Sequence, residues 1–326
     1  MSELIKNKRA TAVHGESPEQ LIDNLTEILR KQTQRTNDII KEYNESETPW
    51  PTFLLVKYIG KDYLATYSFL FYDNTKKIRN LNSTYILPEN PQFVLSFETI
   101  YSLAIFDIDG ETLKSKNCLI PLFVKRKMLN EVEELIIQSK NERSVRQALL
   151  VNDKLVLDVA SEERRKGSLK FNIRLKRLLE EIPVAEVQYS YIPENDIKKA
   201  FAEHKIFMES DTLGCTQSET NRVLVEDDPF LSAVVISDKT NAIGLNRFLA
   251  VLDLDVAKHL ECIKQLARMN FGNYFTLDVY EHIKKKIIEE KDNEVQKKWI
   301  VELYKFFTAE YVDATTQPTC GDTTTR

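Results

Sequence analysis

Asp228, Asp238 and Lys239 are residues whose types could support metal-dependent hydrolysis in the second half of the chain. Enzymes that cleave phosphate esters with Mg²⁺ hold the ion with carboxylates, and a lysine can steady the attacking or leaving oxygen. Asp238 directly precedes Lys239, however, so on a strand the two side chains would point to opposite faces. A solvated turn therefore explains Asp238 and Lys239 better than a nuclease centre does.

A second acidic motif, Asp107-Ile108-Asp109-Gly110, follows an apolar run at residues 103–106. The motif resembles the nucleophile motif of haloacid dehalogenase-type phosphohydrolases. The resemblance covers about eight residues and implies that Asp107 attacks phosphorus, that Asp109 acts as acid or base, and that carboxylates hold Mg²⁺. The family places Thr after the glycine, whereas this chain has Glu111 there. An Asp-Gly turn between two strands is the interpretation we favour.

Basic residues are concentrated between positions 164 and 177. On a helix, Lys170, Arg174 and Arg177 would share one face and could neutralise phosphates without reading a base sequence. Glutamates flank this stretch, so an ordinary solvated helix face is the alternative. The candidate nucleic-acid-binding residues are Arg164, Arg165, Lys166, Lys170, Arg174 and Arg177.

Other residue types give no complete site. His259 and Cys262 have the spacing of half a zinc site, but the sequence offers no second pair of ligands, so we predict no metal centre there. The four cysteines are far apart and form no CxxC motif, which indicates neither a disulfide framework nor a zinc ligand set. The eight glycines do not cluster into a phosphate-binding loop. We expect no cofactor, with Mg²⁺ entering only under the hydrolase alternative.

Composition predicts a globular protein with a sizeable core. The chain has 326 residues, of which 42% are hydrophobic and 29% charged. Its net charge of −5 combines 45 basic with 50 acidic residues, so binding to a polyanion would require a local patch. No stretch approaches the roughly 20 apolar residues that span a bilayer. We therefore expect a cytoplasmic protein without membrane contact.

The sequence patterns of the segments around these residues predict an α+β fold. Its N-terminal half is expected to be antiparallel and β-rich, with one flanking helix. Apolar positions at helical spacing predict that helix between residue 17 and about residue 43. A break around residues 47–51 precedes two β-branched and aromatic runs that read as a hairpin. The expected strands are residues 52–59, 63–72, 83–87, 92–97 and 99–106.

The C-terminal half reads as mainly helical, with one small hairpin. We expect helices from residue 121, over 161–182, over 255–269 and over 277–311, the last with a break near Asn293. Residues 154–159 and 185–191 read as strands, and residues 230–237 and 242–249 as the hairpin. Residues 209–228 are polar and irregular, which is typical of a loop or lid.

The expected organisation is a mobile N-terminus (1–16), an α+β domain (17–160), a mainly helical domain (161–312) and a disordered tail (313–326). Our leading hypothesis is an intracellular, non-enzymatic interaction or regulatory protein that acts in a protein assembly or as a homo-oligomer, with non-specific nucleic-acid contact through residues 164–177 as an option. The alternative is a magnesium-dependent phosphohydrolase or nuclease, for example in a bacterial or phage conflict system. Carboxylates that converge from separate elements would favour the hydrolase, whereas separate, exposed acids would favour the interaction protein.

Overall fold

The structure is a computed structural model. It describes residues 16–45, 52–59, 62–72, 78–79, 86–140, 145–151, 154–159, 161–185, 207–228, 231, 241–268, 271–272 and 275–308.

A five-stranded, all-parallel sheet lies at the centre of the chain, with strand order β6-β3-β2-β7-β8. Central strand β2 pairs with β3 on one side, where Phe93 lies opposite Cys118, and with β7 on the other, where it lies opposite Val223. Parallel sheets are covered on both faces, which is why these short strands are almost entirely apolar and buried. The strands are β2 (Gln92–Leu95), β3 (Cys118–Pro121), β6 (Val184–Ala185), β7 (Arg222–Val225) and β8 (Ala242–Ile243).

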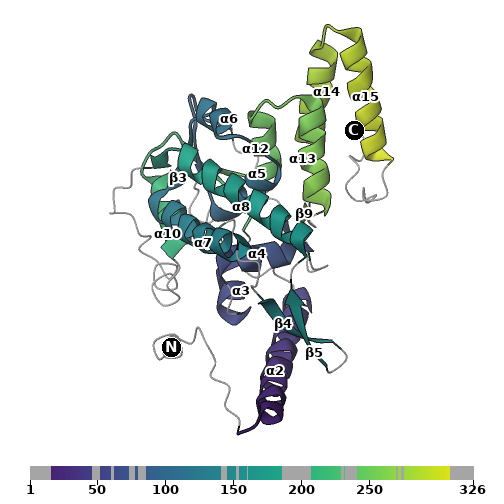
Figure 1. The fold of residues 1–326 in the computed structure, drawn as a ribbon. Coiled ribbons are helices and arrows are strands. Elements are labelled where there is room, and N and C mark those ends of the chain that lie inside the picture. The colour runs from purple at the N-terminus through teal and green to yellow at the C-terminus, as the bar shows by residue number, and fades with distance from the viewer. Residues whose placement is uncertain are drawn as a thin grey trace.

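Helices cover both faces of this sheet. Alternate strand residues point to opposite faces, so Phe93 and Leu95 join the larger core cluster, whereas Val94 joins a smaller one with Leu213 and Cys215. In Figure 1, α7 and α8 lie across the sheet. The helices that connect or cover the strands are α5 (Phe97–Ile105), α6 (Gly110–Ser115), α7 (Leu122–Lys140), α8 (Glu162–Glu181), α10 (Phe207–Gln217), α12 (Leu245–Val251) and α13 (Val256–Arg268).

Side-chain caps fix where several of these helices begin. Ser96 Oγ accepts a hydrogen bond from Thr99 N at 3.2 Å at the start of α5, and Ser161 Oγ accepts one from Arg164 N at 3.3 Å at the start of α8. Such caps satisfy backbone N–H groups that have no partner within the helix. The helix after β2 therefore begins at once, and Glu98 is placed in its first turn.

Two further groups of elements lie at opposite ends of the molecule (Figure 1). The N-terminal helix α2 (Pro18–Glu45) lies beside the antiparallel hairpin of β4 (Val145–Val151) and β5 (Lys154–Val159), and α3 (Thr52–Ile59) and α4 (Tyr63–Tyr72) follow α2 in the chain. At the other end, α14 (Leu277–Glu289) and α15 (Asn293–Phe307) form a helical pair. The two-residue strands β1 (Ile78–Arg79) and β9 (Phe271–Gly272) pair in parallel.

The predicted antiparallel β-rich N-terminal half is wrong. Residues 52–59, 63–72 and 99–106, all expected as strands, form α3, α4 and α5, apart from Phe106 at the end of α5. Leu55 of α3 and Leu64 and Tyr67 of α4 are buried, and in α5 eight of the nine residues are buried. A helix that is buried on most sides loses the polar face from which its period is recognised, and its β-prone residues then read as strands.

Two expected features of the C-terminal half are also wrong. The predicted loop at residues 209–228 contains most of α10 and all of β7. The predicted hairpin is wrong in its second strand, because β8 pairs with β7 in parallel and residues 245–249 begin α12. Of its expected first strand, residues 230–237, only Leu231 lies among the described residues. The Asp109-Gly110 turn is likewise not a hairpin turn, since Asp109 is the N-cap of α6.

Other elements follow the sequence pattern. The strands expected at residues 92–97 and 154–159 correspond to β2 and β5, and the amphipathic helices expected at 17–43, 121 onward, 161–182 and 255–269 correspond to α2, α7, α8 and α13. The break expected near Asn293 separates α14 from α15. Among the described residues, none of the helices combines the length and apolar character needed to cross a membrane.

Several expectations fall on residues that are not described. These are Asp238 and Lys239, residues 83–85 and 186–191 of two expected strands, residues 1–15 of the expected mobile N-terminus and the expected tail at 313–326. Ile86 and Leu87 are described and belong to no strand. The five-stranded sheet draws its strands from both sides of the domain boundary expected at residue 160.

Candidate functional site

The candidate site lies where β2 and β7 end. The chain runs from β2 to β3 and β6 on one side of the sheet, then returns to form β7 and β8 on the other, so the strand order reverses between β2 and β7. Open parallel sheets bind ligands outside the carboxyl ends of their strands at such a switch point. Glu98 follows β2 at this point, and Glu226, Asp227 and Asp228 follow β7 directly.

Five carboxyl side chains are buried around this edge, and we call them the acid cluster: Glu98, Glu209, Glu226, Asp227 and Asp228. Their exposed fractions are all 6% or less, and Glu226 is fully buried. Buried carboxyls are rare unless they are paired with cations or hydrogen-bonded. Among the described residues, Glu98, Glu209 and Glu226 form no ion pair with a lysine or arginine.

Backbone N–H groups bind part of the acid cluster. Glu226 Oε1 accepts hydrogen bonds from the N–H groups of Asp227, at 2.7 Å, and of Asp228. Asp227 Oδ2 accepts one at 3.0 Å from Leu245 N, at the first residue of α12. Asp228 Oδ2 accepts one at 2.8 Å from Thr52 N, at the first residue of α3. The carboxylates after β7 thus fix their own loop and the starts of two helices.

Two oxygens of the acid cluster have no hydrogen-bond partner among the described residues, namely Oε2 of Glu226 and Oε2 of Glu209. The other oxygen of Glu209 accepts a hydrogen bond from the Tyr63 hydroxyl at 3.2 Å. An unsatisfied buried polar atom costs free energy and needs an explanation, such as a bound water or ion or a catalytic role. These two oxygens are therefore the strongest local indication of a ligand.

Burial and mutual repulsion shift the ionisation of the acid cluster. Burial raises the pKa of Glu226 and of Glu98 well above the ordinary value, and the charge of Asp228 adds to both shifts. Burial likewise raises the pKa of Glu209 to about 8, with a further contribution from Asp228. In the absence of a cation, the cluster therefore retains protons at neutral pH.

The chemistry of the acid cluster fits a hard divalent cation. All its donors are carboxyl oxygens, which Mg²⁺, Ca²⁺ and Mn²⁺ prefer over softer metals. Within the described part of the chain, no three His, Cys, Asp or Glu side chains are arranged as a ready ligand set for a metal ion. Cation binding would therefore require carboxylates to exchange some of their backbone hydrogen bonds for the ion.

Asp107 and Asp109 lie outside the acid cluster and are exposed. Asp107 forms an ion pair with Arg174 at 2.9 Å, and its side chain is 68% exposed. The hydrogen bond from Arg174 holds the pKa of Asp107 below its usual value. Asp109 Oδ1 accepts a hydrogen bond from Thr112 N at 2.7 Å as the N-cap of α6. The two acids thus have local structural roles in the structure.

Replacing Asp107 and Asp109 together with Asn should leave stability within about 1 kcal/mol of the wild type. Asn caps a helix as well as Asp does and tolerates the positive φ of 56° at position 107. The lost ion pair with Arg174 is exposed and weak. Thermal unfolding and hydrolysis assays check this expectation. If the wild type hydrolyses a phosphate ester and the folded double variant does not, Asp107 and Asp109 would be part of the active site, as the phosphohydrolase resemblance implies.

Half of the six candidate nucleic-acid-binding residues on α8 form ion pairs within the described part of the protein. Lys166 pairs with Glu162 at 2.6 Å, Arg174 with Asp107, and Arg177 with Glu181 at 2.7 Å. Arg164 and Lys170 are exposed, and Arg165 is partly buried. Because exposed ion pairs contribute only about 0 to 1 kcal/mol, phosphates could compete for these cations. Nucleic-acid binding by residues 164–177 stays a prediction.

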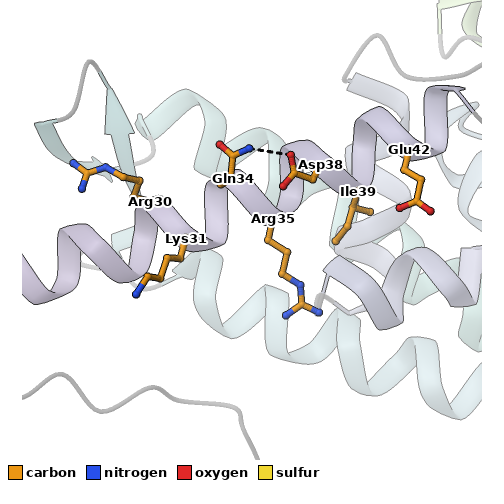
Figure 2. Close-up of a pocket in the computed structure, with 7 residues that line it drawn as sticks. All are labelled: Arg30, Lys31, Gln34, Arg35, Asp38, Ile39 and Glu42. Carbon is orange, nitrogen blue, oxygen red and sulfur yellow. Dashed lines mark hydrogen bonds between the residues drawn. The ribbon is translucent and has the colours of Figure 1, made fainter.

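Two other places in the molecule lack converging reactive groups. The hollow in Figure 2 is lined by seven residues of α2 alone, among which Gln34 donates a hydrogen bond to Asp38 at 2.9 Å. The His259 ring faces His282 of α14 at 5.7 Å between centroids, and burial lowers the pKa of His259 to about 3. Cys262 is buried in the same helix, and the described residues supply no third ligand for a metal.

The acid cluster was only partly visible in the sequence. Asp228 was a candidate residue, but its predicted partners Asp238 and Lys239 lie outside the described residues. Glu98 and Glu209 were missed because their segments were interpreted as a strand and as a loop. A usable signal was present at β7, whose apolar run is followed at once by three acidic residues, while Glu98 comes three residues after the end of β2.

Comparisons with known proteins gave no match to a family model, to a curated protein or to a solved structure.

Proposed function

We propose that the protein is a divalent-cation-dependent hydrolase of phosphate esters whose ion is held by the acid cluster. The observation that carries this proposal is the meeting of five buried carboxyls from the ends of β2 and β7 and from α10, at the point where the strand order reverses. This convergence from separate elements is what a hydrolase requires and what an interaction protein does not need.

The roles of the carboxyls follow from their hydrogen bonds. Glu226 offers Oε2, which has no partner among the described residues, and Asp228 is near enough for its charge to raise the pKa of both Glu226 and Glu98, so these three are the proposed ligands. A bound Mg²⁺ or Mn²⁺ would polarise a phosphoryl oxygen and lower the pKa of a water molecule. Glu209, with a pKa of about 8, suits the transfer of a proton near neutral pH.

Mn²⁺ titration by isothermal calorimetry tests the proposal, together with hydrolysis of bis-p-nitrophenyl phosphate and of a single-stranded oligonucleotide. Replacing Glu226 with Gln should weaken Mn²⁺ binding by more than about 10- to 100-fold, since even outer-shell changes at metal sites cost that much. The matched control is the Asp107→Asn, Asp109→Asn variant, which removes two exposed acids and should bind Mn²⁺ normally. Equal Mn²⁺ affinity in the Glu226→Gln variant and the wild type would refute the proposed site.

A non-enzymatic interaction protein is the second candidate, and exposed apolar side chains on the terminal helical pair favour it. Ile288 on α14 is 66% exposed, and Ile300, Val301 and Tyr304 on α15 are 50% to 69% exposed. Ile300, Val301 and Tyr304 lie within four residues of one another on α15, and clustered exposed apolar side chains are typical of protein contact. Absence of Mn²⁺ binding and of hydrolysis in the wild type and in all variants would favour this candidate.

A further inference from the structure

Helices α3 and α4 begin against acidic side chains beside the candidate site. Thr52 N, at the start of α3, donates to Asp228 Oδ2 at 2.8 Å. At the start of α4, Leu64 N donates to Glu131 Oε2 at 3.0 Å, and the Tyr63 hydroxyl donates to Glu209. Both helix N-termini are thus capped by carboxylates, which complement the partial positive charge of these ends.

Apolar contacts hold the same two helices down. Leu55, Leu64 and Tyr67 are each 3% exposed or less. The Tyr63 and Tyr67 rings make edge contacts with the ring of Phe97, the first residue of α5. The distances between ring centroids are 5.5 and 5.6 Å. Because Phe97 lies two residues after the end of β2, these rings pack beside the carboxyl end of that strand.

The effect on the acid cluster is near-complete exclusion from solvent. Glu98 and Asp228 are 5% and 3% exposed, although an open parallel sheet normally presents this edge to its ligand. The Thr52 side chain hydrogen-bonds to Glu98, and its backbone hydrogen-bonds to Asp228, so α3 contacts the groups after β2 and after β7 together.

We propose that α3 and α4 form an intramolecular plug that closes the candidate site, and that the protein binds its cation and substrate only when this plug is displaced. This inference rests on the proposed function. Asp228 Oδ2 accepts the N–H of Thr52 when the plug is closed and would be offered to the cation when it is open. Closure and cation binding therefore compete for the same oxygen, and each weakens the other by the same factor.

Variants that loosen the plug without altering the acid cluster test the inference. Replacing Leu55 and Leu64 together with Ala removes two of its buried contacts. When only a small fraction of the protein is competent to bind, the apparent Kd equals the intrinsic Kd divided by that fraction. We therefore expect at least tenfold tighter Mn²⁺ binding in this variant, because more of it is open. The matched control is Leu266→Ala in α13, a fully buried leucine outside the plug, which should leave the Kd unchanged.

The outcomes separate the two proposals. The plug is supported if the loosened variant binds Mn²⁺ at least tenfold more tightly than the wild type. It is also supported if the loosened variant binds Mn²⁺ and the wild type shows no measurable binding. Equal affinity in both proteins overturns the plug and leaves the cation site standing. No binding in either protein removes the cation site, and the plug falls with it.

Hydrogen exchange of the wild-type protein decides the question if the variant does not fold. Saturating Mn²⁺ should speed exchange of the backbone amides at residues 52–59 and 62–72 by at least tenfold, while amides of α14 and α15 stay unchanged. Slower or unchanged exchange in the plug at a Mn²⁺ concentration that saturates the site would show that the cation binds without displacing α3 and α4. Where the loosened variant does not fold, failure of the wild type to bind Mn²⁺ at any tested concentration would remove the cation site, and the plug would fall with it.

Discussion

The cation-free protein should lose stability as the pH rises from about 6.5 to about 8. Glu209 has a pKa of about 8 in the folded protein against 4.5 as its ordinary value. Between these values the folded state binds more protons than the unfolded state, so the free energy of unfolding falls as the pH rises. A single group that is protonated in the folded state and ionised in the unfolded state changes the free energy of unfolding by about 1.4 kcal/mol per pH unit. Between about pH 6.5 and 8, Glu209 alone therefore contributes a loss of about 2 kcal/mol.

The neighbours of Glu209 fix the sign of this prediction. Burial and the charge of Asp228 raise the pKa of Glu98 and Glu226 in the same direction, so they add to the loss. His259 acts oppositely, because burial lowers its pKa from 6.5 to about 3, and its contribution is lost as the pH falls below about 6.5. The histidine contribution levels off as the pH rises past this ordinary value, and the acid cluster then determines the slope.

Urea unfolding at closely spaced pH values measures this slope. The Glu209→Gln variant should flatten it, because Gln does not titrate, whereas Asp107→Asn, at an exposed carboxyl that is charged throughout the window, should leave the slope as in the wild type. Added Mn²⁺ should oppose the loss, since a ligand that binds the folded state stabilises it. Stability that rises with pH between about 6.5 and 8 would contradict the protonated, buried state of the cluster.

Replacing Phe248 with Ala should destabilise the protein by about 3 to 5 kcal/mol, the usual cost of truncating a buried aromatic side chain. Phe248 is fully buried on α12, and its ring lies 5.1 Å from that of Phe93 on the central strand. The truncation would leave a cavity between the helix and the sheet that close packing cannot fill. Chemical denaturation measures the change.

A matched substitution in the same helix distinguishes packing from helix propensity. Ala250 is half-buried, and Ala250→Ser should cost about 0.5 kcal/mol, which is mainly the difference in helix propensity. If Phe248→Ala also costs less than about 1 kcal/mol, the packing of α12 on the sheet is wrong.

Amphipathic helices were the predictable part of the fold. On α8, Leu175, Leu178 and Leu179 are buried at helical spacing while the basic residues stay mostly exposed, so the period is visible in the sequence. The helices α3, α5 and α12 show no such contrast. Eight of the nine residues of α5, including Glu98, are buried, and a segment buried on all sides carries no periodic signal that separates helix from strand.

The acid cluster was hard to predict because its members meet through the sheet. Glu98 and Glu226 become neighbours only when β2 pairs with β7 in parallel, and this pairing joins segments about 130 residues apart, as Gln92 and Arg222 show. Composition and spacing cannot reveal a contact of that kind in a single sequence. Four-residue strands such as β2 and β7 also give little alternation from which to recognise a sheet.

The pairing of β2 also sets an order in which the chain can fold during synthesis. Its contact with β3, through Phe93 and Cys118, becomes available early, but β7 leaves the ribosome much later. Until then one edge of β2 has unpaired N–H and C=O groups, which promote pairing with other chains. Asp228, which caps α3, follows β7. Nascent chains that stall before residue 222 should therefore aggregate or recruit chaperones, and release from them should coincide with emergence of β7.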